Sequence, residues 1–405
     1  MNFITITDAE FREFALKSPY KSFMQTPEIA KLREANGWTA YYFAVTEGDE
    51  IKAATMAVAK PTFLGKSTYI LPGGPLLDLE DTALVNFFFK NLAKYIKSHN
   101  GYTLHISPYY ELTERDRHGE KIEGGFNHQK AVKNLKNLGF TKLNHPDQPE
   151  YLFVMDIKGR TPDQILADFK RNTRNHIKKA EKMGVTIREL KKSELDKLKS
   201  ITASTAKRRD FTDKPLSYYE QMYDLFATKN EAKFIIAEAE VPDTACLAEH
   251  EDSPKATGEV LDTTCSAGHE DLARAAWELL PEGHAVSNTS PLVPMSAAMF
   301  MLYGDEVVYL FSGSDEKYMR DYNAQYLIQW HMIKYAAKHN FKVYNFYGIN
   351  GLPNPNSKDY GIYDFKKGFG ADYGRVIELV GSYELSINAP FFALHRFLSK
   401  IKHHK

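Results

Sequence analysis

The chain has 405 residues, enough for two or three domains with cores of their own. Its 52 Lys and Arg residues balance 52 Asp and Glu residues, so net charge selects no class of partner. Two cysteines exclude a disulfide framework, no apolar run reaches the roughly 20 residues that span a bilayer, and the N-terminus lacks a secretory signal pattern, so we expect a soluble, cytoplasmic protein.

The first 60 residues predict two helices followed by a hairpin. A strand and a short helix fit residues 1–20, and the stretch QTPEIAKLRE predicts a second helix because Pro27 suits a first helical turn. Arg33 lies on this second helix. Residues 41–46 and 51–58 then alternate like two strands around the turn at 47–49.

A strand, a helix and a second strand are predicted twice, at residues 68–108 and 307–351. Crossover units of this length have parallel strands and a right-handed connection. The two stretches share six identities at an offset of 240: Tyr69/Tyr309, Gly73/Gly313, Lys94/Lys334, Tyr95/Tyr335, His99/His339 and Asn100/Asn340. We interpret them as two copies of one αβ domain. The alternative is a pair of unrelated amphipathic helices that end alike.

The second copy opens with a predicted helix over residues 161–183. Thr161 can cap it, Pro162 suits its first turn, and Gly184 ends it. Fourteen basic residues against four acidic ones lie between Lys170 and Arg209. Such a basic stripe is either a solvated face or a surface that meets phosphate. From charge alone we predict tRNA contacts by Arg171, Arg174, Lys178 and Lys179.

The pattern of predicted strands and helices in the second copy is interrupted at residues 241–290, whose composition indicates an acidic insertion. A short repeat within it, DTACLAEHED and DTTCSAGHED, supplies Cys246, His250, Cys265 and His269. Two thiolates and two imidazoles could bind zinc, whereas simple duplication accounts for the same pattern. We therefore assign no metal site.

Two C-terminal segments carry residues of interest. INGLPNPNSKDYGIYDFKKGFGADYG predicts a Gly-rich aromatic loop around Phe365, Lys366 and Lys367, which is either a plain surface loop or the wall of a site. The last segment, PFFALHRFLSKIKHHK, is a basic amphipathic helix. It either touches a membrane surface or packs as a terminal helix.

Six stretches together resemble the FemABX peptidoglycan bridge aminoacyltransferases. They are QTPEIAKLRE, the NTRNHIKKA helix, RRDFTDKPLSYYEQMY, LYGDEVVYLFSGS, the QW helix and DFKKGFG, and the resemblance covers nearly everything except residues 241–290. It implies an α/β fold with two tandem acetyltransferase-like domains. We expect the first at 1–152, completed by 378–405, and the second at 153–377, with the insertion at 241–290.

The resemblance implies transfer of Ala, Ser or Gly from aminoacyl-tRNA to the lysine side chain of the peptidoglycan precursor pentapeptide, carried on UDP or on a lipid. We expect no cofactor, a monomer, and a peripheral contact at the cytoplasmic membrane face. Coenzyme A is disfavoured because acidic stretches, GGPLLDLED and GSDEKYMRD, precede the two crossover helices. The alternatives are a non-catalytic tRNA-binding or precursor-binding protein, or aminoacylation of another acceptor.

Five residues receive roles from the resemblance. Arg33 and Lys214 would hold the acceptor's diphosphate, Tyr218 would lie along its nucleotide or sugar, and Phe365 and Lys366 would line the transfer site. Lys366 suits a cation that stabilises the oxyanion of the tetrahedral intermediate, with contact to the 3′ end of tRNA as its competing role.

The chain also departs from the family pattern in three places. Phe311 stands where the family can offer a tyrosine, and Ser107 stands where a carboxylate can occur. Many members carry a long Lys/Glu helical hairpin where this chain has its acidic insertion, so no tRNA contact through such an arm is assumed.

Overall fold

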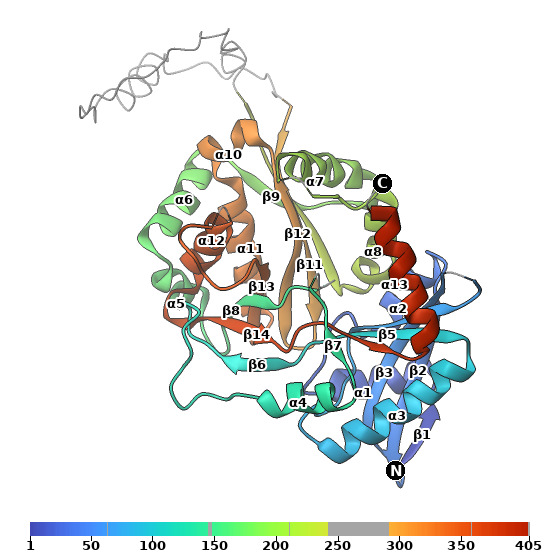
Figure 1. Cartoon of the computed structure of the whole chain (residues 1–405). Helices are drawn as coiled ribbons and strands as arrows, with labels where there is room; N and C mark the ends of the chain where they lie inside the picture. The colour runs from blue at the N-terminus through green and yellow to red at the C-terminus, as the bar shows by residue number, and fades with distance from the viewer. Residues whose placement is uncertain (63, 145–147, 210, 242–290, 358, 404–405) are drawn as a thin grey trace, which may run out of the picture. The chain divides into compact units, whose positions relative to one another are not determined.

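Two mixed β-sheets form the framework of the protein in a computed structural model (Figure 1). The structure describes residues 1–62, 64–144, 148–209, 211–241, 291–357 and 359–403. Most of these residues belong to one unit, Met1–Glu238 with Pro294–Lys405. The cysteines and histidines considered for zinc, at 246, 250, 265 and 269, lie outside the described residues.

The first sheet has seven strands in the order β1-β2-β3-β4-β5-β15-β7. Their bounds are β1 Asn2–Thr5, β2 Thr39–Glu47, β3 Glu50–Pro61, β4 Ser67–Gly73, β5 Gly101–Pro108, β15 Tyr383–Ser386 and β7 Thr141–Lys142. Neighbouring strands are antiparallel except β4 and β5, which are parallel as the crossover unit predicts.

The second sheet has eight strands in the order β6-β14-β8-β13-β12-β11-β10-β9. Their bounds are β6 Glu111–Glu114, β14 Gly374–Leu379, β8 Tyr151–Asp156, β13 Val343–Ile349, β12 Glu306–Ser314, β11 Val293–Tyr303, β10 Ala232–Ala239 and β9 Thr186–Glu189. Here β12 and β13 are the parallel pair. Strand β6, from within the range expected for the first domain, joins this sheet through β14.

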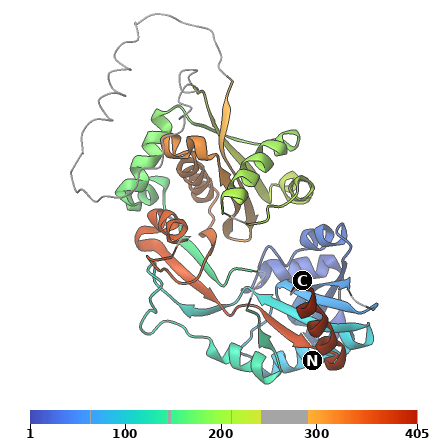
Figure 2. The same ribbon diagram turned by 45° about the horizontal axis from the view of Figure 1, so that its top comes forward.

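Twelve α-helices formed by the described residues accompany the sheets. They are α1 Asp8–Lys17, α2 Pro27–Glu34, α3 Thr82–Ser98, α4 Gln129–Asn137, α5 Pro162–Asp168, α6 Arg171–Lys182, α7 Leu195–Arg209, α8 Leu216–Phe226, α10 Glu316–Tyr322, α11 Ala324–Lys338, α12 Tyr360–Gly370 and α13 Ala389–His403. None of these helices is both long and apolar enough to cross a bilayer. In Figures 1 and 2, α13 lies beside the seven-stranded sheet, where Phe391 packs on Tyr102 of β5.

The order of elements repeats, which confirms the two copies inferred from the sequence. In the first copy β1, α1, α2, β2, β3, β4, α3 and β5 follow one another, and in the second β9, α7, α8, β10, β11, β12, α10–α11 and β13 do so. Residues 240–292 connect β10 to β11, where the first copy has only the turn at 48–49 between β2 and β3. The insertion therefore occupies a hairpin turn of the second copy.

The shared residues at the ends of α3 and α11 make the same contacts in both copies. Tyr95 and His99 stack with ring centroids 3.9 Å apart, and Tyr335 and His339 do the same at 3.9 Å. In each copy the histidine Nδ1 lies 2.8 Å from the tyrosine carbonyl oxygen. An asparagine with a φ of 59° follows each histidine and ends the helix, because asparagine tolerates the left-handed region.

One apolar core joins helices of both copies. It contains Phe11 and Ile29 from α1 and α2, and Tyr219, Met222 and Phe226 from α8. An amide–amide contact from Asn36 Nδ2 to Gln221 Oε1, 3.5 Å long, also joins the segment after α2 to α8. Residues on α2 and α8 can therefore contribute to one site.

Candidate functional site

The main cavity opens where β12 and β13 separate. Their ladder runs only from Glu306 and Val343 to Val308 and Asn345, whereas β4 and β5 stay paired to their ends. Strand β13 bulges against β8 after Asn345, and Tyr347 adopts a φ of 63°. This backbone conformation is rare for a bulky residue and costs free energy. A cavity of about 690 Å³ lies between the separated strand ends.

The cavity is basic and aromatic. Its aromatic lining residues are Phe211, Tyr309, Phe311, Tyr326, Phe346, Tyr347 and Phe365, and its basic ones are Arg208, Arg209, Arg320 and Lys366. Among the described lining residues there is no Asp or Glu. A cavity of this character suits an anionic ligand that carries flat rings.

Lys366 is the buried cation of this cavity. It is only 6% exposed, and its Nζ donates to the carbonyl oxygen of Gly348 at 2.5 Å, with that of Tyr347 3.5 Å away. It has no carboxylate partner within the described chain. Burial lowers the pKa of Lys366 to about 7. At neutral pH the Lys366 amine is therefore present in both its charged and its neutral form, and the role considered from the sequence uses the charged form.

The segment around Phe365 and Lys366 is a helix, α12, so the prediction of a Gly-rich loop was wrong. Its glycines serve close packing instead of a turn. A Cβ atom on Gly370 would lie 2.7 Å from the ring of Phe153 on β8, and one on Gly368 would collide with Thr173 on α6. The Phe365 ring contacts Tyr326 of α11 at a centroid distance of 4.9 Å. Helix packing thus presents Phe365 and Lys366 to the cavity.

The structure brings together the three residues predicted to bind the acceptor. Lys214 Nζ lies 5.5 Å from the centre of the Tyr218 ring, and the positive charge of Arg33 acts on the Tyr218 hydroxyl. Burial raises the pKa of Tyr218 to about 12, and Arg33 opposes that rise. Neither Arg33 nor Lys214 forms an ion pair with a described residue, which leaves both charges available to an anion.

Local structure fixes the segments that carry the two cations near Tyr218. Thr26 caps α2 through a bond from the Ile29 amide at 3.3 Å, and so orients the helix that carries Arg33. Asp213 organises the segment that carries Lys214 by accepting bonds from the Lys214 amide at 2.8 Å and the Tyr219 hydroxyl at 2.9 Å. Burial would raise the pKa of Asp213, but hydrogen bonds led by Lys199 lower it below its ordinary value.

Aromatic contacts connect this acceptor cluster to the cavity. The Tyr218 ring packs edge-on against Phe311 at a centroid distance of 5.9 Å, and Phe311 lines the cavity. Phe311, which the resemblance sets where the family can offer a tyrosine, also packs edge-on against Tyr219 at 6.0 Å. The ring is therefore a wall between the two sites.

The basic segment at 161–183 forms two helices, where the sequence predicted one. The chain is extended at Phe169, whose ring packs against Trp330 and Phe369 at 5.5 and 5.1 Å, and this anchor ends α5. Thr161 and Pro162 start α5 as predicted, and Gly184 follows α6 with a φ of 71°.

The four predicted tRNA residues on α6 differ in their surroundings. Arg171 and Lys178 are exposed and have no described ion-pair partner. Arg174 donates to the carbonyl oxygens of Ala167 and Phe169 at the end of α5, and Lys179 Nζ reaches the Arg320 carbonyl oxygen at 3.3 Å. Helix α6 therefore adjoins α10, which lines the cavity.

The basic segment is less free of acidic partners than its sequence suggested. Five of its fourteen cations form ion pairs: Lys170 with Asp364, Arg188 with Glu194 and Glu238, Lys192 with Asp224, Lys197 with Glu194 and Glu238, and Lys199 with Asp213. Within the described chain the others have no carboxylate partner. Those others concentrate on α6 and at the end of α7.

Sequence reasoning missed several cavity residues. Arg208 and Arg209 belong to a basic cluster that was visible in the sequence but received no role. Nothing in the local sequence marks Tyr309, Arg320 or Gln325, because only the separation of β12 and β13 brings them to one cavity.

Ser107 contributes a hydroxyl where the family can place a carboxylate. Its Oγ lies 2.8 Å from Ser382 Oγ. Nearby, Tyr109 donates to the Glu306 carboxylate at 3.0 Å, and burial raises the pKa of Glu306. Among the described residues, no cluster of His, Cys, Asp and Glu side chains could hold a metal ion.

Two copies of one αβ unit, with a basic cavity in the second copy, define a protein of the tandem acetyltransferase-like class. The FemAB family model matches residues 6–400, so the chain belongs to the FemAB family. This result confirms the resemblance and the fold class predicted from the sequence.

A curated relative and solved structures align with nearly the whole chain. Aminoacyltransferase FemA of Staphylococcus aureus is 29% identical over 426 residues, which cover 99% of each chain. The crystal structure of FemX aligns with a TM-score of 0.74 at 20% identity, over 97% of this chain and 99% of its own. A tandem GNAT protein from the clavulanic acid pathway aligns over 95% of this chain with a TM-score of 0.49.

Proposed function

We propose that this FemAB-family protein is an aminoacyltransferase that moves Ala, Ser or Gly from aminoacyl-tRNA to the lysine side chain of a peptidoglycan precursor pentapeptide. The observation that carries the proposal is the cavity, where a buried lysine with no carboxylate partner among the described residues lies among arginines and aromatic rings. Family membership and a relative named as an aminoacyltransferase support the reaction class.

The chemistry needs little beyond positioning and charge. The acceptor's neutral amine attacks the ester carbonyl carbon, the new C–N bond forms, and the C–O bond to the tRNA ribose breaks. The amine's proton ends on the ribose hydroxyl, so amide and free tRNA are the products. Holding both substrates in line supplies much of the rate. Lys366, in its ammonium form, stabilises the oxyanion of the tetrahedral intermediate, while Phe365 shapes the wall beside it.

The acceptor enters from the cluster of Arg33, Lys214 and Tyr218. Arg33 and Lys214, which form no ion pair with a described residue, hold its diphosphate, and the Tyr218 ring lies along its nucleotide or sugar. Since Tyr218 contacts Phe311, a cavity wall, an acceptor anchored here can extend its peptide toward Lys366.

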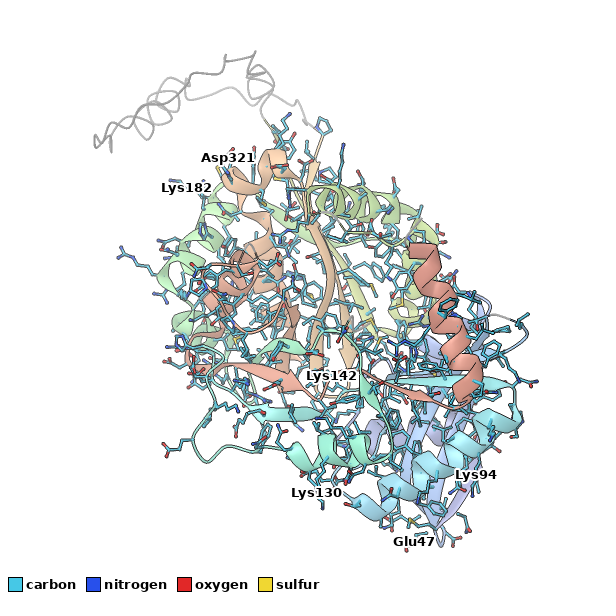
Figure 3. The ribbon with its side chains drawn as sticks, viewed as in Figure 1. Glu47, Lys94, Lys130, Lys142, Lys182 and Asp321 are labelled. Carbon is cyan, nitrogen blue, oxygen red and sulfur yellow. The ribbon has the colours of Figure 1, made fainter. Side chains whose placement is uncertain are left out.

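Replacing Lys214 with Gln should weaken acceptor binding without slowing chemistry. A charge-assisted contact to phosphate contributes about 1.5–3 kcal/mol, so we expect the KM for the acceptor to rise about tenfold or more with kcat nearly unchanged. The control is Lys94→Gln on α3, an exposed lysine labelled in Figure 3, which should alter neither constant. A fall in kcat with constant KM would contradict the assignment.

Transfer itself is tested with purified protein, UDP-muramoyl pentapeptide or its lipid-linked form, and tRNA charged with radiolabelled alanine, serine or glycine. Label on the lysine side chain establishes the reaction and identifies the donor. No label with any donor on either acceptor would refute the proposal. Binding of both substrates without transfer would then favour a non-catalytic binding protein.

The proposed substrates place the protein in the cytoplasm, at the inner face of the membrane when the acceptor is lipid-linked. Helix α13 supports a peripheral contact. One side of it packs on Tyr102 through Phe391, while Leu394 and Phe397 are 44% and 63% exposed. An exposed apolar stripe beside basic residues suits a membrane surface. No cofactor is required, and we propose that the protein acts as a monomer.

A further inference from the structure

Two polar atoms of the cavity are buried without a hydrogen-bond partner among the described residues. They are the acceptor Gln325 Oε1 and the donor Arg208 Nη1. Both residues line the cavity, Gln325 from the start of α11 and Arg208 from the end of α7. Buried polar groups in folded proteins nearly always have partners, so such a pair points to a ligand that supplies them.

Neighbouring side chains fix the orientation of the Gln325 amide. The Tyr309 hydroxyl donates to Ser312 Oγ, and its oxygen accepts a bond from Gln325 Nε2 at 2.9 Å. Because the Nε2 atom is committed to Tyr309, the free atom is the carbonyl oxygen. Gln325 therefore offers the cavity one hydrogen-bond acceptor.

Close packing of α7 on β12 fixes the position of Arg208. The Ser314 amide donates to Thr205 Oγ1 at 3.1 Å. A Cβ atom on Gly313 would lie 2.6 Å from the Ile201 carbonyl oxygen, so only glycine lets the helix come this close. Arg208 follows Thr205 by one helical turn, and the charge of its neighbour Arg209 acts on the Tyr309 hydroxyl. Arg209 therefore lies near the Tyr309–Gln325 pair, and Arg208 lines the same cavity.

The charge and the aromatic lining of the cavity indicate which kind of hydrogen-bond donor would pair with Gln325 Oε1. Four basic side chains and no described acidic one disfavour a cationic ammonium group, so the donor is a neutral N–H. The aromatic walls favour a flat base, and Arg208 favours a phosphate attached to it. Glutamine pairs with the exocyclic amine of adenine in many nucleic-acid complexes. Every aminoacyl-tRNA carries its amino acid on a 3′-terminal adenosine.

We propose that Gln325 Oε1 accepts a hydrogen bond from the exocyclic amine of the terminal adenosine of tRNA, and that Arg208 binds the phosphate of that nucleotide. This inference rests on the proposed function, because it assumes that the donor is a tRNA. It makes Gln325 the residue that recognises the base and Arg208 a residue that recognises charge alone.

The test measures binding and so does not depend on transfer. RNA hairpins with the acceptor stem of tRNA, ending in adenosine or in purine riboside, which lacks the exocyclic amine, are titrated with the full-length protein by fluorescence anisotropy. Wild type should prefer the adenosine hairpin about tenfold. Gln325→Leu should bring the ratio of the two Kd values close to one. Arg208→Gln should weaken both hairpins by the same factor and keep the ratio.

Four other outcomes would overturn the inference. A ratio near one in wild type, or an unchanged ratio in Gln325→Leu, excludes base recognition by this residue while transfer stands. A second pair of hairpins, carrying amide-linked alanine or propionate, separates base from amino acid. If Gln325→Leu removed a preference only for alanine, Gln325 would contact the α-amino group instead. No binding of any hairpin would refute the tRNA-dependent function and this inference with it.

Discussion

The variant Lys366→Met should transfer about a hundredfold more slowly than the wild type and yet unfold at a higher temperature. Loss of one preorganised oxyanion donor typically costs a factor of 10² to 10³ in kcat. Met fills a similar volume and needs no hydrogen bonds, so the cavity wall stays in place. Equal loss of acceptor affinity and rate would contradict a role in the transition state.

The gain in stability follows from the pKa of the buried amine. The pKa of lysine falls from its ordinary 10.5 to about 7 on folding, so at pH 7 the unfolded chain binds more protons than the folded one. The native state then carries a penalty of at most about 5 kcal/mol, which Met removes. The penalty is full below pH 7 and fades as pH rises toward 10.5. Thermal unfolding at pH 6.5 and 9.5 should therefore show a difference between the two proteins that shrinks with pH.

A pH profile separates the two roles open to Lys366. If its ammonium form stabilises the oxyanion, the ratio of wild-type to Lys366→Met rates should fall as pH rises through about 7. Dividing by the variant's rate cancels the titration of the attacking amine. A ratio that rises through the same range would make the neutral amine a general base.

The repeat was predictable because its signals are local. Asn100 and Asn340 each end a helix with positive φ, and the preceding histidines stack on tyrosines one turn back. Such features recur at fixed spacing in any sequence that folds this way. The acidic composition of 241–290 likewise marked the segment between β10 and β11.

Other features depend on contacts that a sequence does not display. Glycines at 368 and 370 suggested a loop, although they let α12 pack against α6 and β8. Helix α5 ends before Phe169 because the ring of this residue packs against Trp330 and Phe369. These errors concerned the secondary structure of the segments around the site. Phe365 and Lys366 line the cavity all the same.

The cavity itself was the least predictable element. It exists because Tyr347 adopts a positive φ at a bulge, where local propensity favours an ordinary strand. That bulge also turns the carbonyl oxygens of 347 and 348 toward Lys366. Arg33, Lys214 and Tyr218 lie near one another in the structure, and the sequence grouped them only because the family resemblance, not any spacing, assigned them one ligand.

The double variant Arg171→Ala/Lys178→Ala should weaken binding of aminoacyl-tRNA about tenfold near 0.1 M salt. Both side chains are exposed on α6 and have no ion-pair partner within the described chain, so each can neutralise one phosphate. Each lost phosphate contact lowers the slope of log K against log salt by about 0.9 for a duplex. We therefore expect the slope to fall by nearly two, as measured by anisotropy across a salt series.

The matched control removes the same charge from another helix. Lys94→Ala/Lys97→Ala changes two exposed lysines on α3, far along the chain from α6 and also without a described ion pair. If α6 contacts RNA directly, the control keeps the wild-type slope. A similar fall in RNA affinity and in the salt slope in both double variants would show that only net charge attracts the RNA. Lys182, the last residue of α6 and labelled in Figure 3, offers a third position to replace. The effect of its loss on RNA binding should depend on how far the acceptor stem extends along the helix.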